Sequence, residues 1–258
     1  MINNVRIIAR LEIKGLNVVK GIQMEGLRVV GQPEEMSNRY FHQGIDEIIF
    51  SDIVASLYNR NHLSELVTKV SNKIFIPLCV GGGVRSIENY RELLRAGADK
   101  ISINSEATRN PLLIEKAANI FGSQCIVASI HAKKISDNNW EPYIENGRER
   151  TFMNVVDWAK KLESLGAGEI LLISVDKDGT CSGFDINLIN LVKKSVSIPV
   201  IACGGASSIE DIYKVCLEAK PSAVAISHIL HFNKFDINTI KDNLLEKGIN
   251  TRKHYVGI

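Results

Sequence analysis

The sequence has little net charge and no long apolar run. Its 258 residues include 31 basic and 29 acidic side chains, so the net charge is only +2. A nucleic-acid-binding surface would require strong basic clustering, so nucleic acid is not an expected partner. No run approaches the roughly 20 apolar residues of a membrane span, and residues 1–6 lack the pattern of a leader. We expect a cytoplasmic protein without a membrane partner.

Cysteine is scarce, and its spacing excludes the usual metal motifs. The five cysteines are scattered and odd in number, which is typical of reduced thiols in a cytosolic protein. No CxxC motif or Cys/His cluster indicates zinc. We therefore expect neither a metal site nor a cofactor. The cysteines are Cys79, Cys125, Cys181, Cys203 and Cys216.

Short apolar runs rich in β-branched residues recur eight times and alternate with amphipathic stretches. This alternation is typical of a parallel sheet covered by helices. The chain length matches one (β/α)8 barrel, so we expect an α/β fold of the TIM-barrel type, as a single domain over residues 1–258. The predicted strands are Val5–Ile13, Glu47–Ile53, Ile74–Val80, Lys100–Ile103, Cys125–Ile130, Glu169–Ser174, Ile198–Ala202 and Ala223–Ser227. The clearest predicted helices are Asn110–Phe121, Phe152–Leu165 and Ile209–Leu217.

The two halves of the chain resemble each other. Residues 76–86 match residues 198–208 at an offset of 122, and residues 44–49 match residues 166–171 at the same offset. A duplicated half-barrel explains this twofold repeat. Two tandem domains are the alternative, although four parallel strands alone would leave exposed edges that barrel closure removes.

Two glycine-rich segments, Val80–Gly83 and Cys203–Gly205, follow predicted strands. The active site of such a barrel lies at the carboxyl ends of its strands, where backbone N–H groups can hold a phosphate. A tight turn that needs glycine for its backbone angles is the alternative for each segment. The symmetric pair favours two phosphate cups and a ligand with a phosphate at each end. The expected cup residues are Gly83, Asn104 and Ser105 in one half, and Gly205 and Ser227 in the other.

The end of the first predicted strand carries Glu12, and the end of the fifth carries His131. Their positions are equivalent in the repeat, which places the two side chains across the barrel mouth from each other. Such a pair can act as general base and general acid, since the pKa of either group can be tuned towards neutral pH. The alternative is that both are polar residues of a solvated rim.

Aspartates lie at the ends of the second and sixth predicted strands, at Asp52, Asp176 and Asp178. Carboxylates so placed often hold a substrate hydroxyl, whereas an Asp-Gly turn at Asp178 and Gly179 is the structural alternative. The polar segment 135–141 is long for a βα loop, which makes it a candidate for a mobile lid.

The starts of four predicted strands carry charges of alternating sign, Arg6, Glu47, Lys100 and Glu169. We call these four residues the barrel-bottom ring. A salt-bridged ring that closes the barrel is the structural interpretation. The functional interpretation is that the four residues form a gate.

Over nearly the whole chain, the sequence resembles the HisF-type cyclase subunits of imidazole glycerol phosphate synthase. The similar segments are residues 18–21, 80–86, 94–100, 121–125 and 178–180. The resemblance implies a heterodimer with a glutaminase that docks on the barrel bottom and sends ammonia through the core. It also implies that the barrel-bottom ring is an ammonia gate, that Asp178 and Gly179 bind substrate, and that Asp99 lies at the partner interface.

The sequence departs from the family at the catalytic pair, which in the family is two aspartates. At those positions stand Glu12 and His131. Glutamate moves the carboxylate by about one methylene, and a displacement near 1 Å can cost on the order of 100-fold in rate. Histidine is neutral or cationic where the family has an anion. Both departures indicate a diverged paralogue.

Four functions therefore remain open. The first is a cyclase and lyase of histidine biosynthesis that acts on a bisphosphorylated, ribotide-like substrate. The second is an ammonia-delivering paralogue, similar to subunits encoded beside surface-polysaccharide (lipopolysaccharide) genes, which serve a third protein that makes an acetamidino sugar. The third and fourth are a related barrel isomerase and a binding scaffold without activity. The barrel-bottom ring favours the two functions that handle ammonia.

Overall fold

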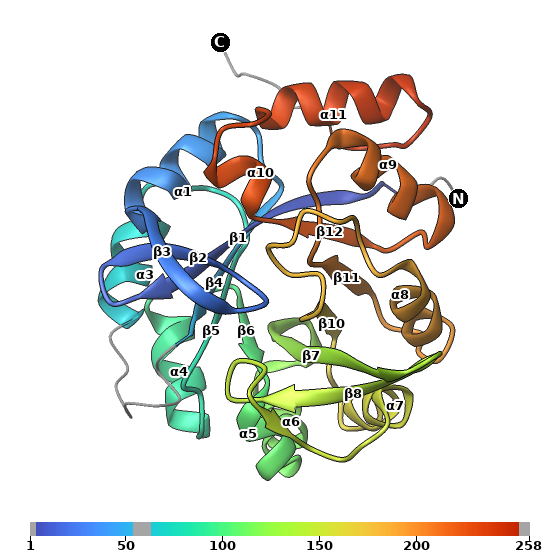
Figure 1. The fold of residues 1–258 in the computed structure, drawn as a ribbon. Helices are drawn as coiled ribbons and strands as arrows, with labels where there is room; N and C mark the ends of the chain where they lie inside the picture. Colours follow the sequence, from blue (N-terminus) through green and yellow to red (C-terminus); the bar gives the residue numbers. More distant parts are fainter. Residues whose placement is uncertain (1–3, 54–62, 253–258) are drawn as a thin grey trace.

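The computed structural model describes residues 4–53 and 63–252. Within them, eight parallel strands form a closed barrel with helices outside (Figure 1). Pairing of β7 with β10 completes the closure. The barrel strands are β1 (Arg6–Lys14), β4 (Glu47–Asp52), β5 (Leu78–Gly81), β6 (Lys100–Ile103), β7 (Ile126–Ser136), β10 (Glu169–Ser174), β11 (Val200–Cys203) and β12 (Ala223–Ile226). The predicted TIM barrel is confirmed.

The helices form because each has one apolar face to pack on the barrel, as Tyr90 and Leu93 of α4 do. None of the helices in the described part of the chain is long and apolar enough to cross a membrane. Residues 1–3, which begin the segment examined for a leader, lie outside that part. The helices are α1 (Pro33–His42), α3 (Leu63–Ser71), α4 (Ile87–Arg95), α5 (Ser105–Arg109), α6 (Leu112–Phe121), α7 (Val155–Ser164), α8 (Ile186–Lys193), α9 (Ile209–Glu218), α10 (His228–His231) and α11 (Ile237–Glu246), with a 3-10 turn at Ser123–Cys125.

The twofold repeat is visible in backbone geometry. Ser86 and Ser208, which lie 122 residues apart, cap α4 and α9 with the same angles, φ −145° and ψ 166°. Asn104 and Ser227 precede the short helices α5 and α10 with similar angles, φ −124° and ψ −81° against φ −129° and ψ −69°. The residues that precede α5 and α10 at the two expected phosphate cups therefore have similar backbone angles.

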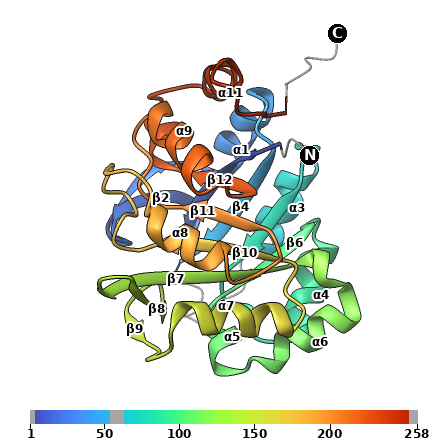
Figure 2. The same cartoon turned by 90° about the vertical axis from the view of Figure 1, so that its right-hand side faces the viewer.

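Two hairpins extend from the carboxyl ends of the barrel strands. One consists of β2 (Asn17–Ile22) and β3 (Glu25–Gly31), and the other joins β7 to β8 (Asn139–Ile144) and β9 (Glu149–Arg150). Figure 2 shows both at the left, opposite the start of β1. The prediction of a loop at residues 135–141 was wrong, because β7 continues to Ser136 and β8 begins at Asn139. The buried Trp140 anchors this hairpin by donating from Nε1 to Asp185 at 2.9 Å.

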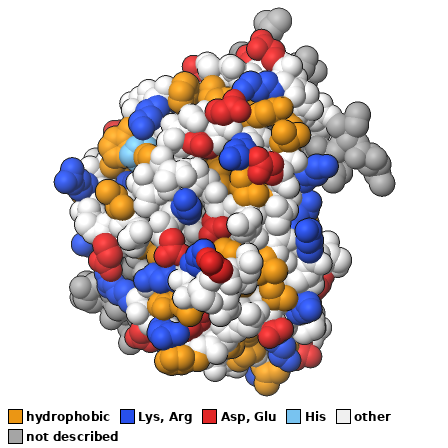
Figure 3. Space-filling view, turned by 45° about the vertical axis from the view of Figure 1, so that its right-hand side comes forward, with side chains coloured by type: hydrophobic (Ala, Val, Ile, Leu, Met, Phe, Trp, Pro, Cys, Tyr) orange, Lys and Arg blue, Asp and Glu red, His pale blue; other side chains and the backbone are white. Residues whose placement is uncertain are grey.

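Side chains of a strand alternate between the barrel interior and the surrounding helices. On β1, Ile7, Ala9, Leu11 and Ile13 pack in the core cluster that includes the helices. Ile8 belongs instead to a smaller interior cluster, and its neighbours at positions 6, 10 and 12 share its side of the strand. On the outer face drawn in Figure 3, acidic and basic side chains are interspersed.

Candidate active site at the barrel mouth

The barrel-bottom ring is assembled as predicted. Arg6 Nη1 lies 2.6 Å from Glu47, and Arg6 also pairs with Glu169. Lys100 Nζ lies 2.9 Å from Glu47 and 3.0 Å from Glu169. Burial raises the pKa of the Glu47 carboxyl, against the opposing effect of Lys100 and Arg6. Each cation therefore contacts both anions, and the four side chains close one end of the barrel.

An apolar layer lies inside the barrel next to the barrel-bottom ring. Its side chains come from alternate positions of the strands and are fully or almost fully buried. The layer includes Ile8, Ile49, Cys79, Val127, Leu171 and Ile201. Neutral small molecules pass such a layer at a lower free-energy cost than ions do, because an ion loses its hydration there.

A buried group of four charges, Arg10, Glu12, Lys20 and Asp178, lies on the mouth side of this layer. We call it the mouth network. Lys20 Nζ donates to both oxygens of Glu12, at 3.0 and 3.1 Å, and to both oxygens of Asp178, at 3.0 and 2.9 Å. Arg10 Nη1 lies 2.7 Å from Glu12 Oε1 and 3.5 Å from Asp178 Oδ1. Two cations thus balance two anions, all of them at most 5% exposed.

These contacts fix the ionisation of Glu12. Burial by itself would raise the pKa of its carboxyl, but Lys20 and Arg10 outweigh burial and hold the pKa below its ordinary value. Burial would likewise lower the pKa of Lys20, and the two carboxylates raise it instead. Glu12 is therefore a carboxylate at neutral pH, and the same cations weaken it as a base.

His131 lies across the mouth, since β7 and β1 are four strands apart in the barrel. Burial, and then the charge of Arg10, lower the pKa of its imidazole to about 3, so the ring is neutral at physiological pH. Among the described residues, Glu12 is hydrogen bonded to Lys20 rather than to His131. The strand order places the two residues on opposite sides of the mouth, where the sequence analysis expected them.

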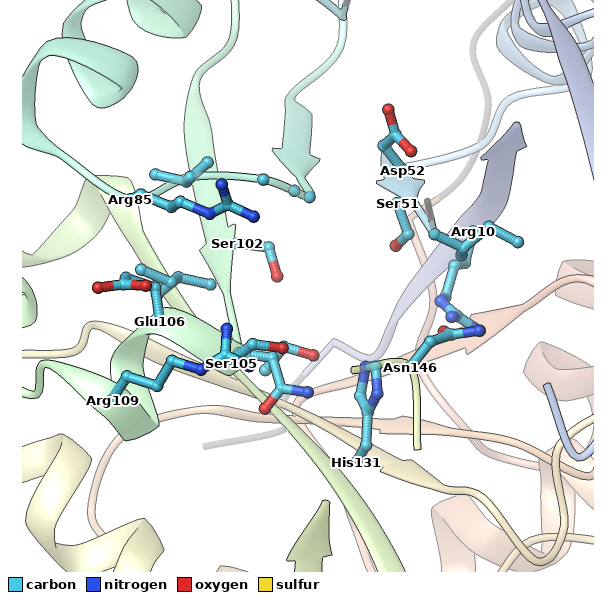
Figure 4. A pocket seen from close by; sticks show the side chains of 18 residues that line it. Arg10, Ser51, Asp52, Arg85, Ser102, Ser105, Glu106, Arg109, His131 and Asn146 are labelled. Carbon is cyan, nitrogen blue, oxygen red and sulfur yellow. The ribbon is translucent and has the colours of Figure 1, made fainter. Parts of the chain in front are cut away.

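A pocket between these strands holds the expected first cup. Gly83, Asn104 and Ser105 line it, together with Arg10 and His131 (Figure 4). The Asn104 amide donates to the Tyr143 carbonyl at 3.1 Å, and Ser105 Oγ accepts from the Glu145 N–H at 3.0 Å. The β8 hairpin is thereby tied to the cup. Gly82 has φ +115°, and a Cβ there would lie 2.4 Å from the Asp52 carbonyl oxygen, so this turn requires glycine.

The expected second cup lines a separate, smaller cavity. Its walls include Asp178, Gly179, Gly205 and Ser227, together with Lys20. Ser227 Oγ donates to the Arg10 carbonyl at 2.7 Å. Asp178 and Ser227 are therefore already engaged within the protein, and the mouth network separates the two cups.

The sequence comparisons agree with this architecture. Residues 6–236 match the model of the histidine biosynthesis protein family. Imidazole glycerol phosphate synthase subunit HisF of Legionella pneumophila is 55% identical over 209 residues, 81% of this chain and 99% of the relative. The same-named subunit of Prochlorococcus marinus is 48% identical over 249 residues, 96% and 98% of the two chains. That of Lactococcus lactis is 46% identical over 248 residues, 96% of each.

The chain belongs to the histidine biosynthesis family and is a HisF-type protein.

In this HisF-type barrel, Arg10 and Lys20 are the site residues that sequence reasoning did not select. The alternation of side chains along β1 would have been enough to place Arg10 in the site, because positions 10 and 12 of a strand must share a face. Lys20 lies on a hairpin that was not predicted, and its reach to Asp178 depends on how that hairpin folds back. Asp176 lies outside the mouth network and accepts from the Lys134 N–H at 2.7 Å.

Asp99, the expected partner-interface residue of the HisF-type fold, follows α4 and precedes β6. Its carboxylate accepts from the Leu78 N–H at 2.8 Å, which joins β5 to the start of β6. A cavity lined by Asp99 also includes Phe75, an aromatic side chain that is 82% exposed. Aromatic side chains are enriched at protein interfaces, so the exposed Phe75 marks this surface as a candidate for partner binding.

Proposed function

We propose that this HisF-type chain is the synthase subunit of a glutamine amidotransferase complex and has cyclase and lyase activity. A glutaminase docked near Asp99 supplies ammonia at the barrel bottom, and the ammonia travels through the interior to the mouth. There it reacts with a bisphosphorylated, ribotide-like ligand held by the two cups. The observation that carries the proposal is the similarity of the backbone angles at Asn104 and Ser227, one in each cup. Relatives named imidazole glycerol phosphate synthase subunit HisF support it.

The interior supports such a route. The barrel-bottom ring closes the entry with four mutually paired charges, and the next layer is apolar. A transient opening of the ring would admit neutral ammonia and disfavour ammonium, because the apolar layer cannot solvate an ion. The ring thus acts as a gate and as a barrier to water.

At the mouth, Glu12 and His131 are the groups proposed to move protons. Glu12 is ionised and can accept a proton, and His131 is neutral and can donate or accept one. Lys20 and Arg10 position the Glu12 carboxylate, and the backbone N–H groups near Gly83 and Gly205 position the phosphates. The N–H groups at both cups hold the ligand across the mouth.

A second candidate function is favoured by the mouth network itself. Lys20 and Arg10 hold Glu12 ionised in a salt bridge, which weakens it as a base and prevents it from carrying a proton as an acid. Such a chain would receive ammonia and pass it to a third protein, as proposed for paralogues linked to acetamidino sugars of surface polysaccharides. The cups would then bind a ligand for regulation or docking.

The deciding experiment is a cyclase assay on the purified chain with the bisphosphorylated ribulosyl ribotide and a high concentration of ammonium salt. Ammonium salt removes the need for the glutaminase. Turnover that Glu12→Ala and His131→Ala each reduce by roughly 100-fold or more would support the first function. Arg91→Ala, on the exposed side of α4, is the matched control and should retain the wild-type rate. Absence of turnover by a folded barrel that still binds a glutaminase would support ammonia delivery instead.

A further inference from the structure

A buried ion pair joins α11 to the starts of β1 and β4, beside the barrel-bottom ring. Lys241 Nζ lies 2.6 Å from Asp46 Oδ1 and donates to the Gly44 carbonyl at 2.7 Å. Lys241 is 3% exposed and Asp46 is 6% exposed. A buried ion pair is weak evidence of a purely stabilising role, because desolvation of the two charges offsets their attraction. We call Lys241 and Asp46 the α11 pair.

The α11 pair contacts the two strands that carry Arg6 and Glu47. Asp46 Oδ2 accepts from the Ile7 N–H at 2.8 Å, and the Asp46 N–H donates to the Ile7 carbonyl at 3.1 Å. Ile7 follows Arg6 in the chain, and Asp46 precedes Glu47. Successive side chains of a strand point to opposite faces. The α11 pair therefore lies outside the barrel wall at the level where the side chains of the ring lie inside it.

The segment after α11 holds the other side of Arg6. The Val5 N–H donates to the Asn250 carbonyl at 2.8 Å, and Val5 forms a parallel bridge with Thr251. Thr251 Oγ1 in turn donates to the Lys241 carbonyl at 3.4 Å. The residues before and after Arg6 are therefore both connected to α11, one through this segment and the other through the α11 pair.

The twofold repeat distinguishes this arrangement from ordinary helix packing. Gly168 stands 122 positions after Asp46, and Asn119 stands 122 positions before Lys241. Asn119 is exposed on α6, the helix equivalent to α11. The Gly168 N–H still donates to the Ile126 carbonyl at 3.1 Å, so the equivalent helix packs and the equivalent strand begins without an ion pair. The α11 pair is therefore a local feature of the side of the ring beside β1 and β4.

We propose that Asp46 and Lys241 are positioning residues that keep the barrel-bottom ring closed. Arg6 makes half of the salt bridges of the ring, so a shift of the start of β1 opens that half. The α11 pair prevents the shift by fixing the Ile7 N–H. This inference rests on the gate of the proposed function and adds the residues that control it from outside the barrel.

Two buried cysteines distinguish opening of the ring from general unfolding. Cys79 belongs to the apolar layer and is the register partner of Lys100. Burial raises the pKa of the Cys79 thiol, and all four charges of the ring also act on it. Cys203 lies at the mouth, where burial raises the pKa of its thiol to about 11 and Arg10 opposes that effect. Opening of the ring exposes Cys79 alone, whereas unfolding exposes both thiols.

The test measures the rates at which a small thiol reagent labels Cys79 and Cys203 in the full chain, resolved by peptide mass spectrometry. We expect Lys241→Met to raise the ratio of Cys79 labelling to Cys203 labelling roughly 10-fold or more, the effect of losing a charge-assisted hydrogen bond. The matched control is Leu244→Ala, which removes a buried apolar side chain from the same helix. It should lower stability and leave the ratio within about twofold of the wild-type value.

Asp46→Asn provides a second variant that keeps an oxygen for the Ile7 N–H and weakens the attraction to Lys241. It should also raise the ratio, whereas Lys241→Arg keeps the charge and should stay closer to the wild type than Lys241→Met. An unchanged ratio in Lys241→Met would overturn the inference, and so would an unchanged ratio in Asp46→Asn if the methionine variant does not fold. An equal rise in Leu244→Ala would also overturn it, because the α11 pair would then act only as a helix anchor.

An assay with the glutaminase connects the α11 pair to the proposed function. Product formed per glutamine hydrolysed should fall in Lys241→Met, because ammonia escapes through an open ring, while turnover with ammonium salt should keep the wild-type rate. An equal fall with both nitrogen sources would overturn the positioning role. Absence of turnover by the wild type with ammonium salt would overturn the proposed cyclase function and leave the labelling result standing, so the two failures are distinguishable.

Discussion

Lys20 holds the mouth network together, because its single ammonium group lies within hydrogen-bond distance of all four oxygens of two buried carboxylates. Lys20→Met would leave Glu12 and Asp178 with Arg10 alone. Removing one partner of a buried ion pair costs about 3–5 kcal/mol, and we expect a loss of stability of that size in urea unfolding. The control Lys214→Met removes a lysine that is 60% exposed and lies 4.0 Å from Glu218. That change should cost less than about 1 kcal/mol, and equal losses for the two variants would contradict the network.

Two histidines with lowered pKa values, His131 and His231, predict how stability depends on pH. Burial lowers the pKa of His131 and of His231 to about 3 each, against about 6.5 in the unfolded chain. The unfolded state therefore binds more protons below pH 6.5, so the free energy of unfolding should fall as the pH drops from about 6.5 towards 3. Because the pKa of Glu12 is also lowered, its contribution to stability is lost on the same acid side.

The histidine prediction is checked by urea unfolding at pH 7 and pH 5. His131→Asn should reduce the loss of stability between these pH values by about 1–2 kcal/mol. His42→Asn, which replaces an exposed histidine of α1, should leave the loss unchanged. A loss that is the same in wild type and His131→Asn would show that the imidazole titrates normally in the folded protein.

At the scale of elements, the repeat provides a matched pair of helix caps beside the cups. Ser86 Oγ accepts from the Asn89 N–H, and Ser208 Oγ accepts from the Asp211 N–H. Ser86→Ala and Ser208→Ala should each cost about 0.5–2 kcal/mol, whereas the corresponding glycine variants should lose only a few tenths. Thermal and urea unfolding measure the difference. Alanine and glycine variants of equal stability would show that these side chains do not act as caps.

At the scale of the whole molecule, the proposed gate role of the barrel-bottom ring can be tested. Lys100→Met would leave Glu47 and Glu169 to share Arg6. If the ring is a gate, turnover driven by glutamine through the glutaminase should change several-fold, while turnover driven by ammonium salt should not. Lys69→Met on the exposed face of α3 is the control. An equal change with both nitrogen sources would assign the ring a structural role alone.

Local patterns in the sequence were enough for the barrel and for part of its site. Strand alternation, the 122-residue repeat and the glycine-rich turns predicted all eight barrel strands, because these signals depend on neighbours along the chain. The same signals placed the expected cup residues next to the ends of those strands. The segment 135–141 was misjudged as a loop. Its pairing depends on contacts with distant residues, such as that of Trp140 with Asp185.

The sequence by itself determined the fold, the barrel-bottom ring and the positions of Glu12 and His131 across the mouth. Only the tertiary structure decided their ionisation and their partners. Lys20 reaches Asp178 across 158 positions of the chain, and Arg10 meets Glu12 inside a closed barrel. Burial and charge pairing act through space and set the pKa of each group, so the chemistry of the mouth depends on distances that no spacing along the chain specifies.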